Sequence, residues 1–210
     1  AHALGRLDEA QDAYAESECL RRKLINEFGE TPERLRDLSL SMDRLGEVAH
    51  ALGRLDEAQD AYAESERLRR ELINEFGANP ERLRDLSISM INLGALAQTL
   101  RRLDEAHDAY TESERLRHKL IDEFGRNPER LRDLSISMSN LGEVAQALGR
   151  LDEAKTAYAE SQRLRRELIS EFGKTPERLR YLSLSMNKLG EISQALGRLD
   201  EAEIAYSESQ

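Results

Sequence analysis

The chain has 210 residues, of which 39% are hydrophobic and 34% are charged, with 41 acidic against 31 basic side chains. This composition is too apolar for a disordered chain, and no window approaches 18 uncharged apolar residues, which excludes a transmembrane helix. The net charge of −10 argues against non-specific nucleic-acid binding, which depends on neutralising phosphates. We therefore expect a soluble, acidic, helical protein with neither a membrane nor a nucleic-acid partner.

The same sequence returns every 48 residues along the chain. The segment Ala-Leu-Gly-Arg-Leu-Asp-Glu-Ala begins at Ala3 and recurs at Ala51, Ala147 and Ala195. We expect one repeat array over residues 1–210, in which full units 32–79, 80–127 and 128–175 are flanked by partial units 1–31 and 176–210. Because no unit needs an insertion or a deletion, the sequence leaves no place for a linker or a domain boundary.

The first half of each unit is predicted to form a helix of roughly 20 residues. In the first full unit Thr31 is placed to cap the helix and Pro32 to occupy its first position, where the missing N–H costs nothing. Apolar residues then follow at steps of three and four, at Leu35, Leu38, Met42, Leu45, Ala49 and Leu52. Gly53 is expected to end the helix in a left-handed conformation.

The second half of each unit is predicted to form another helix, capped by Asp56 and ended by Gly77. Its buried side is expected to contain Ala58, Ala61, Tyr62, Ser65, Leu68, Leu72 and Phe76. Glutamates that alternate with Arg67, Arg69 and Arg70 are interpreted as a mixed-charge exposed face. The short turn between the helices predicts that they lie antiparallel.

The fold class that follows is all-α. One helix hairpin cannot bury its own apolar sides, so neighbouring hairpins must stack into an α-solenoid. A single closed bundle of about eight helices is the alternative, but identical buried patterns in every unit favour repetition of one interface over closure of a bundle.

Each unit resembles a tetratricopeptide repeat. Leu45-Gly46 is followed 13 residues later by Ala58 and then by Tyr62, which is the family's spacing, and the set recurs in the later units. The resemblance implies a right-handed superhelix of antiparallel helix pairs. The family's period is about 34 residues, so the 48-residue unit is interpreted as a lengthened variant in which each helix gains about two whole turns.

Residues suited to catalysis or metal binding are few. The histidines His2, His50, His107 and His118 do not converge as metal ligands must, and Cys19 replaces an arginine of the other units, so it is interpreted as a surface residue. Serines such as Ser39, Ser41 and Ser65 recur in every full unit and are interpreted as small packing residues. We expect no catalytic residue, no metal and no cofactor, and therefore no enzyme activity.

The units differ from one another mainly along one side of the first helix. Four positions of that helix vary, at successive steps of one, three and three residues. We call these positions the first-helix stripe: Asp43, Arg44, Glu47, His50, Ile91, Asn92, Ala95, Gln98, Ser139, Asn140, Glu143, Gln146, Asn187, Lys188, Glu191 and Gln194. The variation has two readings, because it marks either a binding surface or positions that vary only because they are exposed.

The family resemblance implies that the first-helix stripe lines a concave groove in which a protein or peptide binds. Asn92 and Asn140 are similar to asparagines with which family members hold an extended peptide, and an amide both donates and accepts hydrogen bonds. Ile91 with Ala95 would form an apolar spot, and the glutamates would favour basic partners. The family's clamp for a C-terminal carboxylate needs more cations than Arg44 and Lys188 supply.

The ends of the chain suggest a second hypothesis. The sequence is expected to begin at Ala1 in the last turn of a first helix and to stop at Gln210 within a second helix, and neither end resembles a polar cap. Either the chain is a fragment of a longer array, or copies associate head to tail as a structural assembly. A regulatory array of a larger protein is a third reading, and a cytoplasmic location is expected from the single thiol and the lack of a visible signal peptide.

Overall fold

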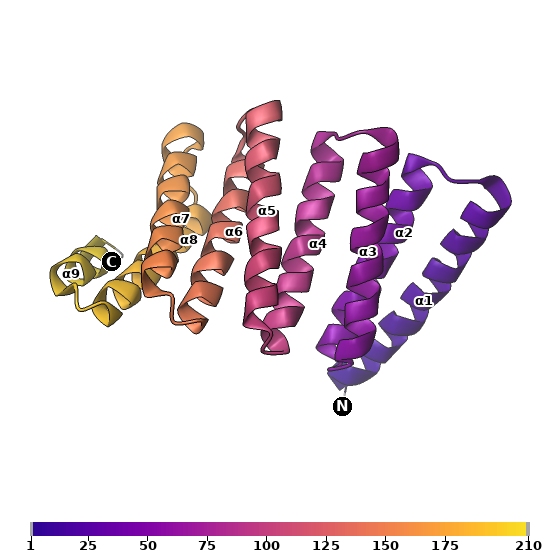
Figure 1. The fold of residues 1–210 in the computed structure, drawn as a ribbon, viewed down its shortest axis with the longest axis horizontal. Coiled ribbons are helices and arrows are strands. Elements are labelled where there is room, and N and C mark those ends of the chain that lie inside the picture. The colour runs from indigo at the N-terminus through magenta and orange to yellow at the C-terminus, as the bar shows by residue number, and fades with distance from the viewer. Residues whose placement is uncertain (1, 209–210) are drawn as a thin grey trace. The chain divides into compact units, whose positions relative to one another are not determined.

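The computed structural model describes residues 2–208, and their side chains over residues 7–207. Within these residues the chain forms nine helices (Figure 1): α1 (His2–Phe28), α2 (Pro32–Ala51), α3 (Leu55–Phe76), α4 (Pro80–Thr99), α5 (Leu103–Phe124), α6 (Pro128–Ala147), α7 (Leu151–Phe172), α8 (Pro176–Ala195) and α9 (Leu199–Glu208). The side chain of His2, the backbone of Ala1 and that of Gln210 lie outside the described residues. The helices divide into two compact parts, Ala1–Arg102 with α1–α4 and Leu103–Gln210 with α5–α9, and each part is described by itself.

The first helices of the repeats begin as predicted. Pro32 occupies the first turn of α2, and the side chain of Thr31 accepts a hydrogen bond of 3.3 Å from the backbone N–H of Arg34. Asn79, Asn127 and Thr175 cap α4, α6 and α8 in the same way. At the other end Gly53 takes φ 75°, the left-handed conformation that glycine adopts without strain.

The second helices begin two residues earlier than a cap at Asp56 would require. Helix α3 starts at Leu55, its N-cap residue is Arg54, and no side chain caps it. The prediction that Asp56 is the cap is therefore wrong, because the backbone of Leu55 is already helical. Asp56 instead lies in the first turn, where its carboxylate faces the positive end of the helix dipole.

Helix α1 also differs from the prediction. The sequence predicts that a first helix ends near Gly5, as the corresponding helices end at Gly53 and Gly149, but the structure has one helix from His2 to Phe28. Only four residues precede Gly5, too few to form a separate hydrogen-bonded turn that would hold a bend.

Two kinds of apolar cluster occur in each part and hold its helices together. In the first part Leu35, Leu38 and Leu72 pack with neighbours from α1, α2 and α3, while Tyr62 and Leu96 join α2, α3 and α4. The second part contains the same two clusters, two repeats later in the chain. One is built around leucines of α6 and α7, and the other around Tyr158 and Ile192. A repeated interface of this kind is the organisation of an α-solenoid.

The prediction that Phe76 belongs to the buried side is wrong. Its side chain is 39% exposed, and the equivalent phenylalanines of α1, α5 and α7 are exposed as well. Phe76 lies in the last turn of α3, beyond the packed length of the helix, and the guanidinium of Arg82 covers its ring at 5.8 Å. The same arginine donates hydrogen bonds of 2.6 and 2.8 Å to the backbone oxygens of Phe76 and Gly77, which fixes the turn into α4.

None of the helices within residues 2–208 combines the length and the apolar composition that a bilayer crossing requires.

Candidate functional site

A close helix contact sets the orientation of the first-helix stripe. A Cβ atom added at Gly46 would lie 2.5 Å from the ring of Tyr62, and one added at Gly142 would lie 2.7 Å from the ring of Tyr158. The predicted roles of these residues are confirmed, since the glycine allows the close approach and the tyrosine fills the space. This contact holds one side of α2 and α6 against the second helix, and the stripe borders that side, since Gln146 accepts a hydrogen bond of 3.4 Å from the hydroxyl of Tyr158.

Most residues of the first-helix stripe reach the surface. Exposed side chains are those of Arg44, Glu47, Glu143, Gln146, Glu191 and Gln194, and half-buried ones are those of His50, Ile91, Asn92, Ala95, Gln98, Ser139, Asn140, Asn187 and Lys188. Asp43 is buried. The accessible part of the stripe thus contains charged, amide and apolar groups on α2, α4, α6 and α8.

Several contacts order the stripe within each part. Arg44 and Glu47 form an ion pair of 2.7 Å on α2, and Nε2 of His50 lies 3.0 Å from Oγ1 of Thr99, which links α2 to α4. The amide nitrogen of Asn92 is buried and donates to none of the described residues. A buried donor without a protein partner costs free energy, because it has lost its hydration.

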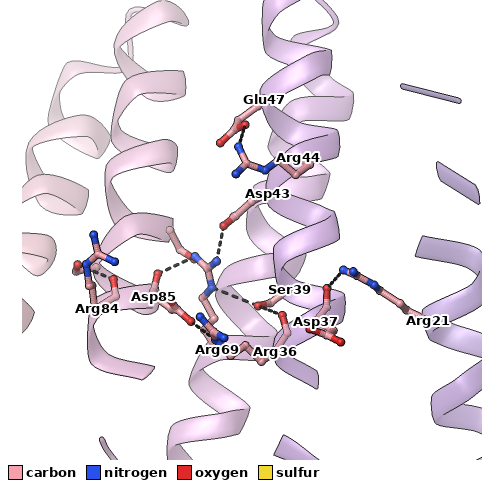
Figure 2. A network of polar contacts seen from close by, with 12 residues as sticks. Arg21, Arg36, Asp37, Ser39, Asp43, Arg44, Glu47, Arg69, Arg84 and Asp85 are labelled. Atoms are coloured by element: carbon pink, nitrogen blue, oxygen red, sulfur yellow. Dashed lines mark hydrogen bonds and ion pairs between the residues drawn. The ribbon is translucent and has the colours of Figure 1, made fainter. Parts of the chain in front are cut away.

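Asp43 belongs to the stripe in sequence, but its side chain lies in the interior of the first part. The side chain is 6% exposed and pairs with the guanidinium of Arg69, which reaches it from α3 (Figure 2). The corresponding position of the second part, Ser139, also faces an arginine, because its hydroxyl accepts a hydrogen bond of 2.9 Å from Arg165. At this position of the stripe the side chains, Asp43 on α2 and Ser139 on α6, therefore contact the second helices α3 and α7.

Arg69 is one of four arginines that repeat and that we call the interlock arginines: Arg21, Arg69, Arg117 and Arg165. Each donates from a second helix to the backbone oxygen of the residue 16 positions later, on the following first helix. Arg69, at 2% exposed, also donates to the hydroxyls of Ser39 and Ser89, at 3.3 and 2.7 Å. The prediction that Arg69 lies on an exposed charged face is therefore wrong, because its side chain joins consecutive repeats.

The packing serines are confirmed as buried, and they do more than fill space. Ser39, Ser41 and Ser65 are at most 3% exposed, and Ser39 and Ser41 accept hydrogen bonds from interlock arginines. A hydroxyl beside a buried guanidinium satisfies N–H donors that no water reaches. The sequence signal that identifies these arginines is their recurrence at one repeat phase together with the recurring serines.

Burial changes the acidity of several groups. It raises the pKa of the Tyr62, Tyr110 and Tyr158 hydroxyls well above the ordinary value, because a buried phenolate loses its hydration. Burial likewise raises the pKa of the Asp43 carboxyl, and the guanidinium of Arg69 opposes that rise. These shifts belong to structural positions, and a perturbed pKa alone does not identify a catalytic group.

The histidines and acidic clusters lie on the surface of the separate parts. His107 and Glu153 approach at 2.6 Å, and His118 lies 3.0 Å from Glu114 on the same helix. Carboxylate oxygens of three residues of the first part lie within 4.8 Å of one another: Glu30, Glu71 and Glu75. Such clusters are common on acidic proteins, and we assign no metal to this one.

Comparisons with known proteins agree with the repeat pattern. Models of the tetratricopeptide repeat match residues 135–172 and 44–64. A search of curated protein sequences finds no match.

Solved structures of helical repeat proteins share the fold at low identity. A putative kinesin light chain from Podosopora anserina with nearly identical TPR-like repeats is 18% identical, with 95% of this chain and 94% of that chain covered and a TM-score of 0.60. BtubC (BKLC) from P. vanneervenii is 16% identical over 97% and 89% of the two chains, with a TM-score of 0.57. MamA is 17% identical over 99% and 89%, with a TM-score of 0.55. Residues 44–64 and 135–172, which lie on the stacked helix pairs of the two parts, are therefore tetratricopeptide repeats within an α-solenoid.

Proposed function

We propose that this chain is a protein-interaction module that binds a peptide or protein segment along the first-helix stripe and performs no catalysis itself. The observation that carries the proposal is the combination of variability and accessibility on one side of α2, α4, α6 and α8. The second helices, in contrast, expose charged pairs that satisfy each other, such as Arg67 between Glu64 and Glu71 at 2.8 Å to each.

Two asparagines of the stripe are suited to an extended peptide. Asn92 on α4 and Asn140 on α6 are half-buried at the same repeat position, so part of each side chain reaches the surface. An amide held on a rigid helix pairs with a backbone N–H and C=O of a bound strand. Glu143 and Glu191 lie on the exposed part of the stripe and favour a segment with basic residues.

The test is the affinity of a selected ligand for matched variants. A peptide is selected from a random display library against the whole chain, and its Kd is measured by calorimetry. Replacing Asn92 and Asn140 together by alanine is expected to weaken binding by about tenfold or more, as the loss of two hydrogen bonds implies. Asn74→Ala, which removes an exposed asparagine of α3, is the control. Equal affinities of all three proteins would contradict the proposal.

A second candidate function is self-association, supported by apolar side chains that the inner repeats bury. Leu24 of α1 is 42% exposed, whereas its repeat equivalent Leu72 is 2% exposed. Leu179 of α8 is likewise exposed, and its equivalent Leu131 is buried. A second-helix face and a first-helix face of this kind are the two sides of the repeated interface, so copies could associate head to tail.

Light scattering over a range of protein concentrations tests this second candidate. Self-association predicts a mass that rises with concentration, and Leu24→Glu is expected to hold the mass at 23.9 kDa, because a charge at this position opposes burial. A constant mass for the unchanged chain, or a rising mass in the variant, would count against association through these faces.

A further inference from the structure

The second part contains a pocket of about 330 Å³ between α6, α7 and α8. Three arginines line it: Arg132 from α6, Arg165 from α7 and Arg178 from α8. Arg178 is held by the backbone oxygens of Phe172 and Gly173, at 2.6 and 2.8 Å. The ring of Tyr181 from α8 and the apolar side chains of Ile136 and Leu168 complete the wall. Its volume suits a small ligand or a few side-chain atoms of a larger one.

The first part shows what normally surrounds the first two of these arginines. Arg36 and Arg69 occupy the positions equivalent to Arg132 and Arg165, two repeats earlier. Arg36 pairs with Asp85 at 2.7 Å and with Glu81 at 3.0 Å, and Arg69 pairs with Asp43. Both guanidinium groups of the first part are therefore matched by carboxylates of the chain itself (Figure 2).

The second part lacks both aspartates. Ser139 stands at the position of Asp43, and Tyr181 stands at the position of Asp85. Arg165 is 7% exposed, and among the described residues it contacts hydroxyls, the backbone oxygen of Tyr181 and the tyrosine ring at 5.8 Å, but no carboxylate. The guanidinium of Arg132 forms no ion pair with any residue that the structure describes.

A buried guanidinium without a negative partner is destabilising, because hydrogen bonds to neutral groups replace only part of its hydration. The planar arrangement of its N–H groups fits the two oxygens of a carboxylate. Beside it, Ile136, Leu168 and Tyr181 offer an apolar wall for the carbon atoms next to such a group.

We propose that this pocket binds the carboxylate of a ligand, which takes the place that Asp43 and Asp85 occupy in the first part. Arg165 forms the inner contact and Arg132 the outer one. The pocket deepens the proposed function, on which it rests for its partner, since Arg132 and Ile136 lie on α6 one to two turns before Ser139 and Asn140 of the stripe. It specifies an acidic group on the bound segment, next to the glutamates that favour basic ones.

The acidic residues at the rim set the strength of the site. Glu177 lines the pocket and is the repeat equivalent of Glu81, which pairs with Arg36. Its carboxylate repels an anionic ligand at the rim, so Glu177→Gln is expected to tighten binding. Glu129 also lines the pocket, and its carboxylate likewise weakens the binding of an anion.

The test follows the side-chain Nε–H signals of Arg132 and Arg165 by NMR on the intact chain. The probes are N-acetyl-phenylalanine, which carries a terminal carboxylate, and N-acetyl-glutamic α-amide, which carries a side-chain carboxylate. N-acetyl-phenylalanine amide, without a carboxylate, is the matched control, and inorganic phosphate tests for a general anion site. Saturable shifts of both arginine signals with at least one carboxylate, and none with the amide, are expected. The more tightly bound probe identifies the source of the carboxylate.

Two variants restore the aspartates of the first part. Tyr181→Asp and Ser139→Asp each supply an internal carboxylate that the same position carries elsewhere in the array, so both are compatible with the fold. Each is expected to weaken carboxylate binding by about tenfold or more. The proposal is overturned if neither carboxylate gives a saturable shift, if phosphate binds more tightly than both, or if both variants bind like the unchanged chain.

This outcome is separable from that of the stripe. A selected peptide that loses affinity in the Asn92 and Asn140 variant but not in Tyr181→Asp supports the stripe and contradicts the pocket. Loss in Tyr181→Asp alone supports the pocket and contradicts the assignment of the asparagines.

Discussion

Replacement of Gly142 by alanine tests the contact that orients the first helices. The added Cβ atom would lie 2.7 Å from Cε1 of Tyr158, about 0.7 Å short of an ordinary 3.4 Å contact. The ring is 1% exposed and packs with Ala145, Ala154 and Ile192, so it has no free direction in which to move.

The expected magnitude is the difference between two effects. Overpacking in a close-packed interior costs about 1–3 kcal/mol. Alanine in place of glycine within a helix contributes about 1 kcal/mol in the opposite direction. Because the ring is enclosed, we expect the upper half of the packing range and a net loss of about 1–2 kcal/mol in the free energy of unfolding.

The assay is urea unfolding followed by circular dichroism, in two backgrounds. In a Tyr158→Leu background the ring is absent, and Gly142→Ala is expected to be neutral or to stabilise by up to about 1 kcal/mol, the helix-propensity gain. The double-mutant cycle isolates the contact between the two residues. An equal effect of Gly142→Ala in both backgrounds would refute the packing argument.

Three further predictions follow from the interior and the turns. Arg69→Met leaves Asp43 buried and unpaired and is expected to cost about 3–5 kcal/mol in thermal unfolding, and adding Asp43→Leu should recover most of that loss; a single variant as stable as the unchanged chain would contradict the interlock. Arg101 holds φ 60° where the other repeats have glycine, so Arg101→Gly is expected to stabilise by about 1 kcal/mol in urea and Arg101→Ala to give no such gain; equal effects would show that the backbone there is not strained. The raised pKa values of Tyr62 and Tyr158 mean that the folded state keeps their protons while the unfolded state releases them above about pH 10, so stability is constant below that pH and falls above it; a urea midpoint that stays constant well above pH 10 would contradict their burial.

Much of the fold follows from local sequence signals. Thr31 and Pro32 start a helix because a side-chain acceptor and a missing N–H both suit a helix start, and the structure has these residues in those places. Gly53 follows the end of that helix with φ 75°, a left-handed conformation that glycine adopts without strain. Phe76 was harder to place, because helical spacing puts it on the buried side, whereas the packed length of α3 ends before it and Arg82 covers its ring.

The interlock arginines show where a local pattern is ambiguous. Arg67, Arg69 and Arg70 follow one another closely, and in sequence all three resemble an exposed charged face. Only Arg69 points toward the next repeat, where a backbone oxygen and a serine hydroxyl receive it. Burial of this arginine depends on partners 16 and 20 residues away, and a single-helix pattern contains no information about them.

The stripe was identified because the units of the chain differ there, and the structure adds which of its residues reach the surface. Asp43 and Ser139 occupy one phase of the stripe but contact interlock arginines. Comparison of the units also reveals the two missing aspartates of the α6–α8 pocket, but only the structure indicates that Ser139 and Tyr181 adjoin the same arginine.

The most direct test of the central claim is to map where a bound segment lies. A peptide selected against the whole chain is titrated into the isotope-labelled protein, and backbone and side-chain amide shifts are recorded by NMR. The account predicts that the largest shifts fall on the accessible first-helix stripe of α2, α4, α6 and α8, with the side-chain amides of Asn92 and Asn140 among them. Shifts confined to the charged outer faces of α3, α5 and α7 would contradict it.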